Sequence, residues 1–95
     1  MMSTLRLRIT GRVQGVGYRA SLLDAAIRHG LRGWVRNRLD GSVEALLHGP
    51  AADCDAVVAW AHRGPPAARV KAVEVTRLEA TVADLQPDFE CRPTA

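Results

Sequence analysis

The chain has 95 residues, of which 47% are apolar and only four are aromatic. This length predicts a single domain, residues 1–95, with one core of Leu, Val, Ile and Ala. No segment approaches the roughly 20 apolar residues of a membrane span or resembles a signal peptide, so we expect a cytoplasmic protein without a membrane partner. Two cysteines, Cys54 and Cys91, are too few to stabilise a secreted domain through disulfide bonds. We expect both to be small buried side chains of a protein in a reducing compartment.

The net charge of +3 is unevenly distributed. Residues 1–50 carry eight arginines and three acidic residues, whereas residues 51–95 carry five basic and seven acidic residues. The basic half also contains a glycine-rich stretch, which fits a small anionic ligand.

The first element is a strand. Leu5, Leu7 and Ile9 alternate with polar residues and predict a half-buried strand that ends near Gly11 or Val13.

A glycine-rich loop, defined as residues 11–19 (Gly-Arg-Val-Gln-Gly-Val-Gly-Tyr-Arg), joins this strand to a helix. Glycines let the backbone turn tightly and approach a ligand, and the start of a helix leaves several N–H groups unpaired. Such a turn is suited to an anion, most naturally phosphate, and Arg19 adds a permanent charge with a planar set of donors. The alternative is a tight turn without a ligand. The spacing matches neither the dinucleotide fingerprint nor the P-loop.

The helix that follows has an apolar stripe at helical spacing, with Gly30 as the expected C-cap. The stripe consists of Tyr18, Leu22, Leu23, Ala26 and Ile27.

A hairpin comes next. A strand from Trp34 to Leu39 is expected to return through a two-residue Asp40-Gly41 turn into an alternating strand from Val43 to Leu47.

The second half of the chain predicts a helix that begins at Ala52-Asp53, with Asp53 as N-cap, and ends at Gly64-Pro65-Pro66. A fourth strand, with an irregular alternation that suggests a bulge, runs from Val70 to about Glu79. A short extended tail, Phe89 to Arg92, is expected to pair at a sheet edge.

This order of elements predicts an α+β fold, a ferredoxin-like βαββαβ sandwich. It has an antiparallel sheet, two helices on one face and a short extra edge strand. The first two strands run parallel with the third between them, so the glycine-rich loop and the end of the second strand lie at the same edge. Side chains can reach across that gap of about 9.6 Å, twice the usual strand spacing. Asn37 is the polar residue best placed to face Arg19, although an edge-exposed Asn37 without a role is the alternative.

The sequence gives little support for a catalytic triad or a metal site. No hydrolase triad is visible, and the three histidines, at positions 29, 48 and 62, lie on separate elements without ligand spacing, so no metal site is expected. We expect Arg12, Arg36 and Arg38 to be solvated side chains, and Trp34 and Trp60 to be core or lid residues.

Two motifs resemble signatures of the acylphosphatase family. The first is the glycine-rich loop, and the second is residues 33–43, Gly-Trp-Val-Arg-Asn-Arg-Leu-Asp-Gly-Ser-Val. Gly64-Pro65-Pro66 with Val70 and Val73, and Phe89 with Arg92, match later family features, so the resemblance covers essentially the whole chain in the right order.

The resemblance implies hydrolysis of the carboxyl-phosphate bond of small-molecule acyl phosphates by a monomer, without cofactor, metal or nucleic acid. Arg19 and the loop amides of Gln14, Gly15, Val16, Gly17 and Tyr18 would hold the phosphate, and Asn37 would position the attacking water. The residues are compatible with this activity, because the carboxylate leaving group is stable as an anion and phosphoryl transfer depends mainly on positioning and charge stabilisation.

Two alternatives come from other functional classes. One is a non-catalytic module on the same fold that binds anions or nucleic acid; however, this chain lacks the pair of sheet aromatics on which RNA-binding versions stack bases. The other is a regulatory or carrier domain, such as the acylphosphatase-like domain of carbamoyl-transfer maturation enzymes. We expect a free-standing enzyme instead, and acyl-phosphate hydrolysis by the purified protein separates these possibilities.

Overall fold

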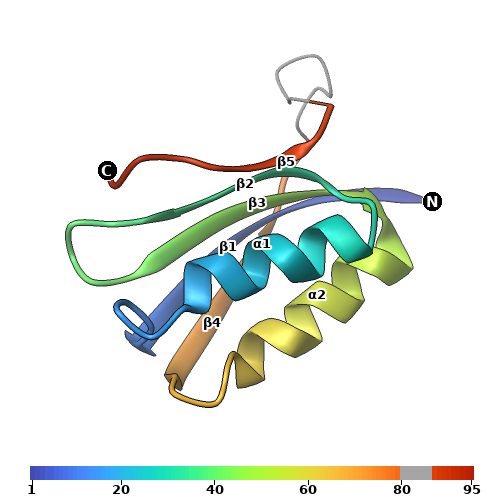
Figure 1. Cartoon of the computed structure of the whole chain (residues 1–95). Helices are drawn as coiled ribbons and strands as arrows, with labels where there is room; N and C mark the ends of the chain where they lie inside the picture. Colours follow the sequence, from blue (N-terminus) through green and yellow to red (C-terminus); the bar gives the residue numbers. More distant parts are fainter. Residues whose placement is uncertain (80–86) are drawn as a thin grey trace.

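The computed structural model describes residues 1–79 and 87–95. The elements follow the expected order: β1 (Met2–Arg12), α1 (Tyr18–Arg28), β2 (Arg32–Asn37), β3 (Val43–Pro50), α2 (Ala51–Arg63), β4 (Arg69–Arg77) and β5 (Phe89–Cys91). Both helices lie on the same face of the sheet (Figure 1), which confirms the ferredoxin-like α+β fold.

The five strands form one sheet in the order β4-β1-β3-β2-β5. β1 pairs antiparallel with β3 and β4, and β2 pairs antiparallel with β3, so β1 and β2 run in the same direction on either side of β3, as expected. β5 adds the expected edge strand but pairs parallel with β2, which makes the sheet mixed rather than wholly antiparallel. The register of β1 against β4 shifts between Thr10 and Gly11, next to the glycine-rich loop, so the predicted irregularity is present.

The core lies between the sheet and the helices. Alternate positions of the central strands are fully buried on the helix-facing side, because successive side chains of a strand point to opposite faces. The strands contribute Leu5, Leu7, Ile9, Val35, Val43, Ala45 and Leu47, and the helices contribute Tyr18, Leu22, Ala26, Cys54, Val57 and Ala61. Neither of the two described helices lies over the opposite face of the sheet (Figure 1).

The hairpin between β2 and β3 is wider than the predicted two-residue turn. Its connection runs from Arg38 to Ser42 and is closed by the Arg38 N–H, which donates to the Ser42 carbonyl at 2.8 Å. A type I′ turn needs a positive φ at both central residues, whereas in this hairpin Gly41 (φ 94°) takes one and Asp40 does not. β2 consequently ends at Asn37, two residues earlier than predicted.

Several predicted details of the helices are wrong. Asp53 is not the N-cap of α2; the cap is Pro50, and Asp53 lies in the first turn, where its carboxylate contacts the His29 ring. The C-cap of α1 is His29 rather than Gly30. Ile27 is 56% exposed, because the buried stripe of α1 follows residues 18, 22 and 26 and leaves Ile27 on the flank. Neither described helix is long and apolar enough to cross a membrane.

The two cysteines have different environments. Cys54 is buried, as expected, and its burial raises the pKa of its thiol. Cys91 is exposed at the edge strand, so the prediction of a buried residue is wrong at this position. Both thiols are free.

Candidate active site

A cavity of about 190 Å³, which we call the loop cavity, lies where the glycine-rich loop enters α1. Residues far apart in the sequence meet there, because β1 and β2 end at the same edge of the sheet on either side of β3. Its lining consists of Val13, Gln14, Gly15, Gly17, Tyr18, Arg19, Ala20 and Asn37. The structure thus brings together all the predicted site residues except Val16, whose side chain packs partly against the core instead.

Two glycines of the loop have a backbone conformation that other residues rarely take. Gly15 has φ 74° and Gly17 has φ 79°, both in the left-handed region that side chains disfavour. Gly17 is also the N-cap of α1, and because glycine has no side chain it cannot cap the N–H groups of the first turn. No described residue accepts a hydrogen bond from the backbone N–H groups of residues 15–18. These donors, together with the positive end of the helix dipole, make the cavity attractive to an anion.

Arg19 provides the permanent charge at this cavity. It is the second residue of α1, its side chain is half-buried, and it borders the loop cavity. Within residues 1–79 and 87–95, its guanidinium makes no hydrogen bond or ion pair. A half-buried guanidinium without a carboxylate partner has its planar donors available for a ligand.

Asn37 lines the same cavity as Arg19, as the topology predicted. It is the last residue of β2, two residues after buried Val35, so its side chain points to the helix-covered face of the sheet. Its Oδ1 atom is buried and has no hydrogen-bond partner among the described residues. A buried carbonyl oxygen without a donor costs free energy, which favours a functional role for Asn37 over an idle position at the edge.

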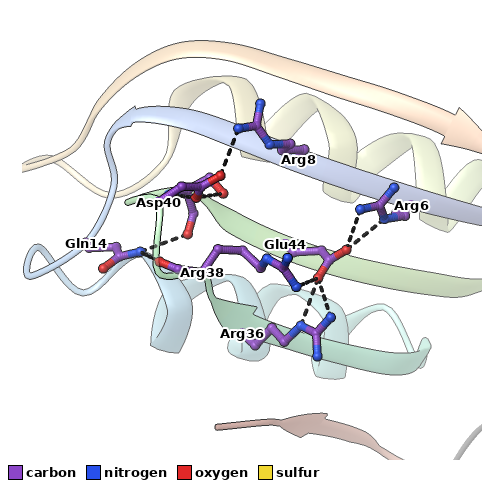
Figure 2. A network of polar contacts seen from close by, with 8 residues as sticks. Arg6, Arg8, Gln14, Arg36, Arg38, Asp40 and Glu44 are labelled. Atoms are coloured by element: carbon purple, nitrogen blue, oxygen red, sulfur yellow. Dashed lines mark hydrogen bonds and ion pairs between the residues drawn. The ribbon is translucent and has the colours of Figure 1, made fainter. Parts of the chain in front are cut away.

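Gln14 connects the glycine-rich loop to the hairpin that follows Asn37. Its Nε2 donates to two backbone carbonyl oxygens, those of Arg38 and Ser42, each at 2.8 Å (Figure 2). Sequence reasoning assigned only the backbone amide of Gln14 to the site and missed this contact. The side chain fixes the distance between the loop and the end of β2.

Asp40 stiffens the same hairpin. One carboxylate oxygen accepts hydrogen bonds from the backbone N–H and the hydroxyl of Ser42, and the other accepts from Arg8 at 3.0 Å (Figure 2). The Ser42 hydroxyl, the Ser42 N–H and the Arg8 guanidinium hold the pKa of Asp40 well below its usual range. The hairpin therefore keeps these bonds at neutral pH.

The end of the chain also holds β2 in place. The Ala95 N–H donates to the carbonyl of Asn37 at 3.1 Å, and the Ala95 carbonyl accepts from the N–H of Leu39 at 2.8 Å. Backbone bonds therefore fix Asn37 from one side, while Gln14 holds the following hairpin from another.

The comparisons with known proteins agree with this site. The sequence model of the acylphosphatase family matches residues 5–91. The acylphosphatase of Azoarcus sp. strain BH72 is 58% identical over 88 residues, which are 93% of this chain and 87% of that protein. The crystal structure of the acylphosphatase from Bacillus subtilis superposes with a TM-score of 0.89 at 34% identity and covers 97% of this chain and 99% of that one.

The chain belongs to the acylphosphatase family. Membership, together with identity to acylphosphatases over almost the full length, makes the protein an enzyme that hydrolyses acyl phosphates.

The same fold also occurs inside much longer chains. The structure of T. kodakarensis HypF matches 95% of this acylphosphatase chain with a TM-score of 0.80 and 27% identity, but the match covers only 12% of the HypF chain.

A second polar network of this acylphosphatase lies on the uncovered face of the sheet, outside the loop cavity. The buried carboxylate of Glu44 contacts Arg6 at 2.7 Å, Arg36 at 2.8 Å and Arg38 at 3.4 Å (Figure 2). Burial alone would raise the pKa of Glu44, but the hydrogen bonds from Arg36 and Arg6 outweigh it and leave the pKa lowered. The expectation that Arg36 and Arg38 are merely solvated is therefore wrong, because both are ordered around one carboxylate.

Trp34 and the histidines lie outside the loop cavity. The Trp34 ring is neither a core nor a lid residue; it is flanked by the guanidinium groups of Arg36 and Arg92, at 4.7 and 5.0 Å from its centroid. His29 contacts Asp53 and His48 contacts Thr4. Across the described ranges, no three His, Cys, Asp or Glu side chains are grouped closely enough to hold a metal ion.

The loop geometry makes a testable prediction at Gly15. Gly15→Val should weaken competitive inhibition by inorganic phosphate about tenfold, because a side chain at this positive φ costs about 1–2 kcal/mol and projects into the space beside the N–H groups. Gly30→Val is the matched control, since Gly30 has a similar φ of 66° and also has open space around it but lies beyond the end of α1. Parental phosphate inhibition in Gly15→Val would mean that the loop does not hold the phosphate.

Proposed function

We propose that this chain cleaves acyl phosphates by direct attack of a water molecule on a phosphate group held in the loop cavity. Arg19 and the N–H groups of residues 14–18 would bind the phosphate oxygens, and the Asn37 side chain would hold the water. The observation that carries the proposal is that one small cavity is lined by Arg19, by the loop with its N–H groups and by Asn37. Among the described residues, the guanidinium of Arg19, the N–H groups of residues 15–18 and the buried Oδ1 of Asn37 have no hydrogen-bond partner.

The proposed step needs no covalent intermediate. The water oxygen forms a bond to phosphorus while the bond between phosphorus and the carboxyl oxygen breaks, and its electron pair leaves with the carboxylate. The water donates one hydrogen bond to Oδ1 of Asn37, which fixes its direction of attack. Its proton passes to an oxygen of the phosphate group, so the products are a carboxylate and inorganic phosphate.

A general acid is unnecessary in this scheme. The leaving carboxylate has a pKa near 4, so it departs as a stable anion at neutral pH. Tyr18, which borders the cavity, is unsuited to proton transfer, because its hydroxyl donates to the Ala61 carbonyl at 2.7 Å and burial raises its pKa. Arg19 and the loop amides instead stabilise the charge that spreads over the phosphate oxygens in the transition state.

The alternative is a non-catalytic anion-binding or regulatory module on the same fold. Such a module would need Arg19 and the loop amides, but it gives no reason for Asn37, whose buried amide oxygen has no partner among the described residues, to line the same cavity. The position of Asn37 therefore favours hydrolysis.

The purified chain should hydrolyse acetyl phosphate, and the rate should survive exhaustive treatment with EDTA. The described residues that border the loop cavity include no carboxylate or histidine that could anchor a metal ion. Release of inorganic phosphate from acetyl phosphate, with and without EDTA, provides the measurement. Loss of activity in EDTA that one added divalent ion restores would overturn the proposed mechanism, and absence of hydrolysis under all conditions would favour the non-catalytic module.

A further inference from the structure

A second and larger cavity lies between the two helices. It has a volume of about 540 Å³, and we call it the interhelical groove. Its apolar walls come from both helices and from the loop that follows α2. The lining includes Ala20, Ala56, Trp60, Gly64, Pro65 and Pro66.

The interhelical groove adjoins the loop cavity. Ala20, in the first turn of α1, borders both cavities. Tyr18 lines the loop cavity, and its ring centroid lies 5.4 Å from that of Trp60, which lines the groove. A Cβ added to Gly64, another groove residue, would lie only 2.8 Å from the Tyr18 ring. The Tyr18 ring thus has the phosphate-binding loop on one side and the groove wall on the other.

The sizes of the two cavities assign different parts of an acyl phosphate to them. A space of about 190 Å³ is smaller than the roughly 300–1,000 Å³ of cavities that enclose a drug-sized ligand, so it suits a phosphate group with little more. An acyl group larger than acetyl must therefore extend out of the loop cavity. The groove begins at Ala20, which also borders the loop cavity, and runs along α1 to Arg28, so it is near enough and large enough to receive the acyl group.

The charged side chains that line the groove favour a neutral acyl group over an anionic one. Arg28, at its far end, is paired with Asp24 at 2.7 Å, and His29 is in contact with Asp53 at 2.9 Å. Because each of these basic groups already has a carboxylate partner, the described lining of the groove has no free cation to bind a second anionic group. The indole of Trp60 and the rings of Pro65 and Pro66 instead offer flat apolar surface.

We propose that the interhelical groove is the acyl-group subsite of this enzyme and that it favours acyl phosphates with a flat, uncharged acyl group such as benzoyl. The inference rests on the proposed function, because it assumes that the phosphate end of the substrate occupies the loop cavity. Binding of the acyl group there buries apolar surface, so the preference is carried by KM.

The test compares kcat/KM for benzoyl phosphate and acetyl phosphate in Ala56→Leu and Ala59→Leu. Both changes place the same side chain on α2, but Ala56 lines the groove, whereas Ala59 is exposed and borders neither cavity. Ala56→Leu should lower the benzoyl-to-acetyl ratio about tenfold, on the scale of a few methylene groups in an apolar pocket. Ala59→Leu should leave the ratio at the parental value.

A second measurement does not depend on turnover. The non-hydrolysable analogue benzoylphosphonate should shift the NMR signal of the Trp60 indole N–H in the parental protein, whereas acetylphosphonate should not. If Ala56→Leu fails to fold, this comparison still decides the question.

The outcomes are distinguishable. Hydrolysis of both substrates with an unchanged ratio in Ala56→Leu, or no effect of benzoylphosphonate on Trp60, would overturn the subsite and leave the proposed function standing. An equal fall of the ratio in both variants would also overturn it, because the effect would then belong to α2 as a whole. Failure to hydrolyse either substrate would instead overturn the proposed function itself.

Discussion

Asn37→Ala should lower the turnover of acetyl phosphate by about 10²–10³, the usual cost of losing one preorganised hydrogen bond in a transition state. The buried Oδ1 of Asn37 has no donor among the described residues, and in the proposed mechanism it accepts a hydrogen bond from the attacking water. Inhibition by inorganic phosphate should remain within a few-fold of the parent, because in the proposed mechanism the loop and Arg19 hold the phosphate. Steady-state kinetics with acetyl phosphate and phosphate inhibition provide the measurements.

The fold of the Asn37→Ala variant should be intact. The contacts that fix this position are made by its backbone, through the bond from Ala95, and by the neighbouring carbonyls that Gln14 binds. The thermal midpoint should therefore barely change. Unchanged turnover would make Asn37 idle, and a loss of turnover matched by equal losses of phosphate affinity and stability would make it a structural residue.

Arg19→Lys should reduce phosphate affinity and turnover together, each by about 10–100-fold, because a charge-assisted contact is worth about 1.5–3 kcal/mol. Lysine keeps the charge but loses the planar pair of donors that matches two phosphate oxygens. Both parameters should fall because the same contact serves the ground state and the transition state.

Arg28→Lys provides the matched control for Arg19→Lys. Arg28 lies on the same helix, but its guanidinium is exposed and paired with Asp24 at 2.7 Å. This variant should have parental kinetics with acetyl phosphate. Near-parental values for Arg19→Lys as well would show that Arg19 is only a surface charge.

The location of the site could be predicted from the sequence because two local signals combine with one topological rule. Glycines at positions 15 and 17 mark a backbone that takes positive φ, and both do so in the structure. The βαββαβ order then places the end of β2 beside that loop, with β3 between β1 and β2. Arg19 and Asn37 were therefore expected to face one cavity, and they do.

The contacts that hold the site together could not be predicted from the sequence. The bonds from Gln14 to the carbonyls of Arg38 and Ser42 span 24 and 28 residues, and no local pattern marks them. The bonds between Ala95 and the end of β2 could not be predicted either. They depend on the parallel pairing of β5 with β2, and a strand of three residues is too short for its pairing to be recognised in the sequence. The polar network around Glu44 could not be predicted either. The alternation of polar and apolar residues along a strand shows which face of the sheet a side chain lies on, but not which arginines contact Glu44.

Hydrolysis of acetyl phosphate in ¹⁸O-labelled water tests the central claim most directly, with both products analysed by mass spectrometry. If a water held by Asn37 attacks a phosphorus held by Arg19 and the loop amides, the label must enter inorganic phosphate, and the acetate must remain unlabelled. Label in the acetate would show that water attacks the carbonyl carbon, and it would contradict direct attack on a phosphate bound in the loop cavity.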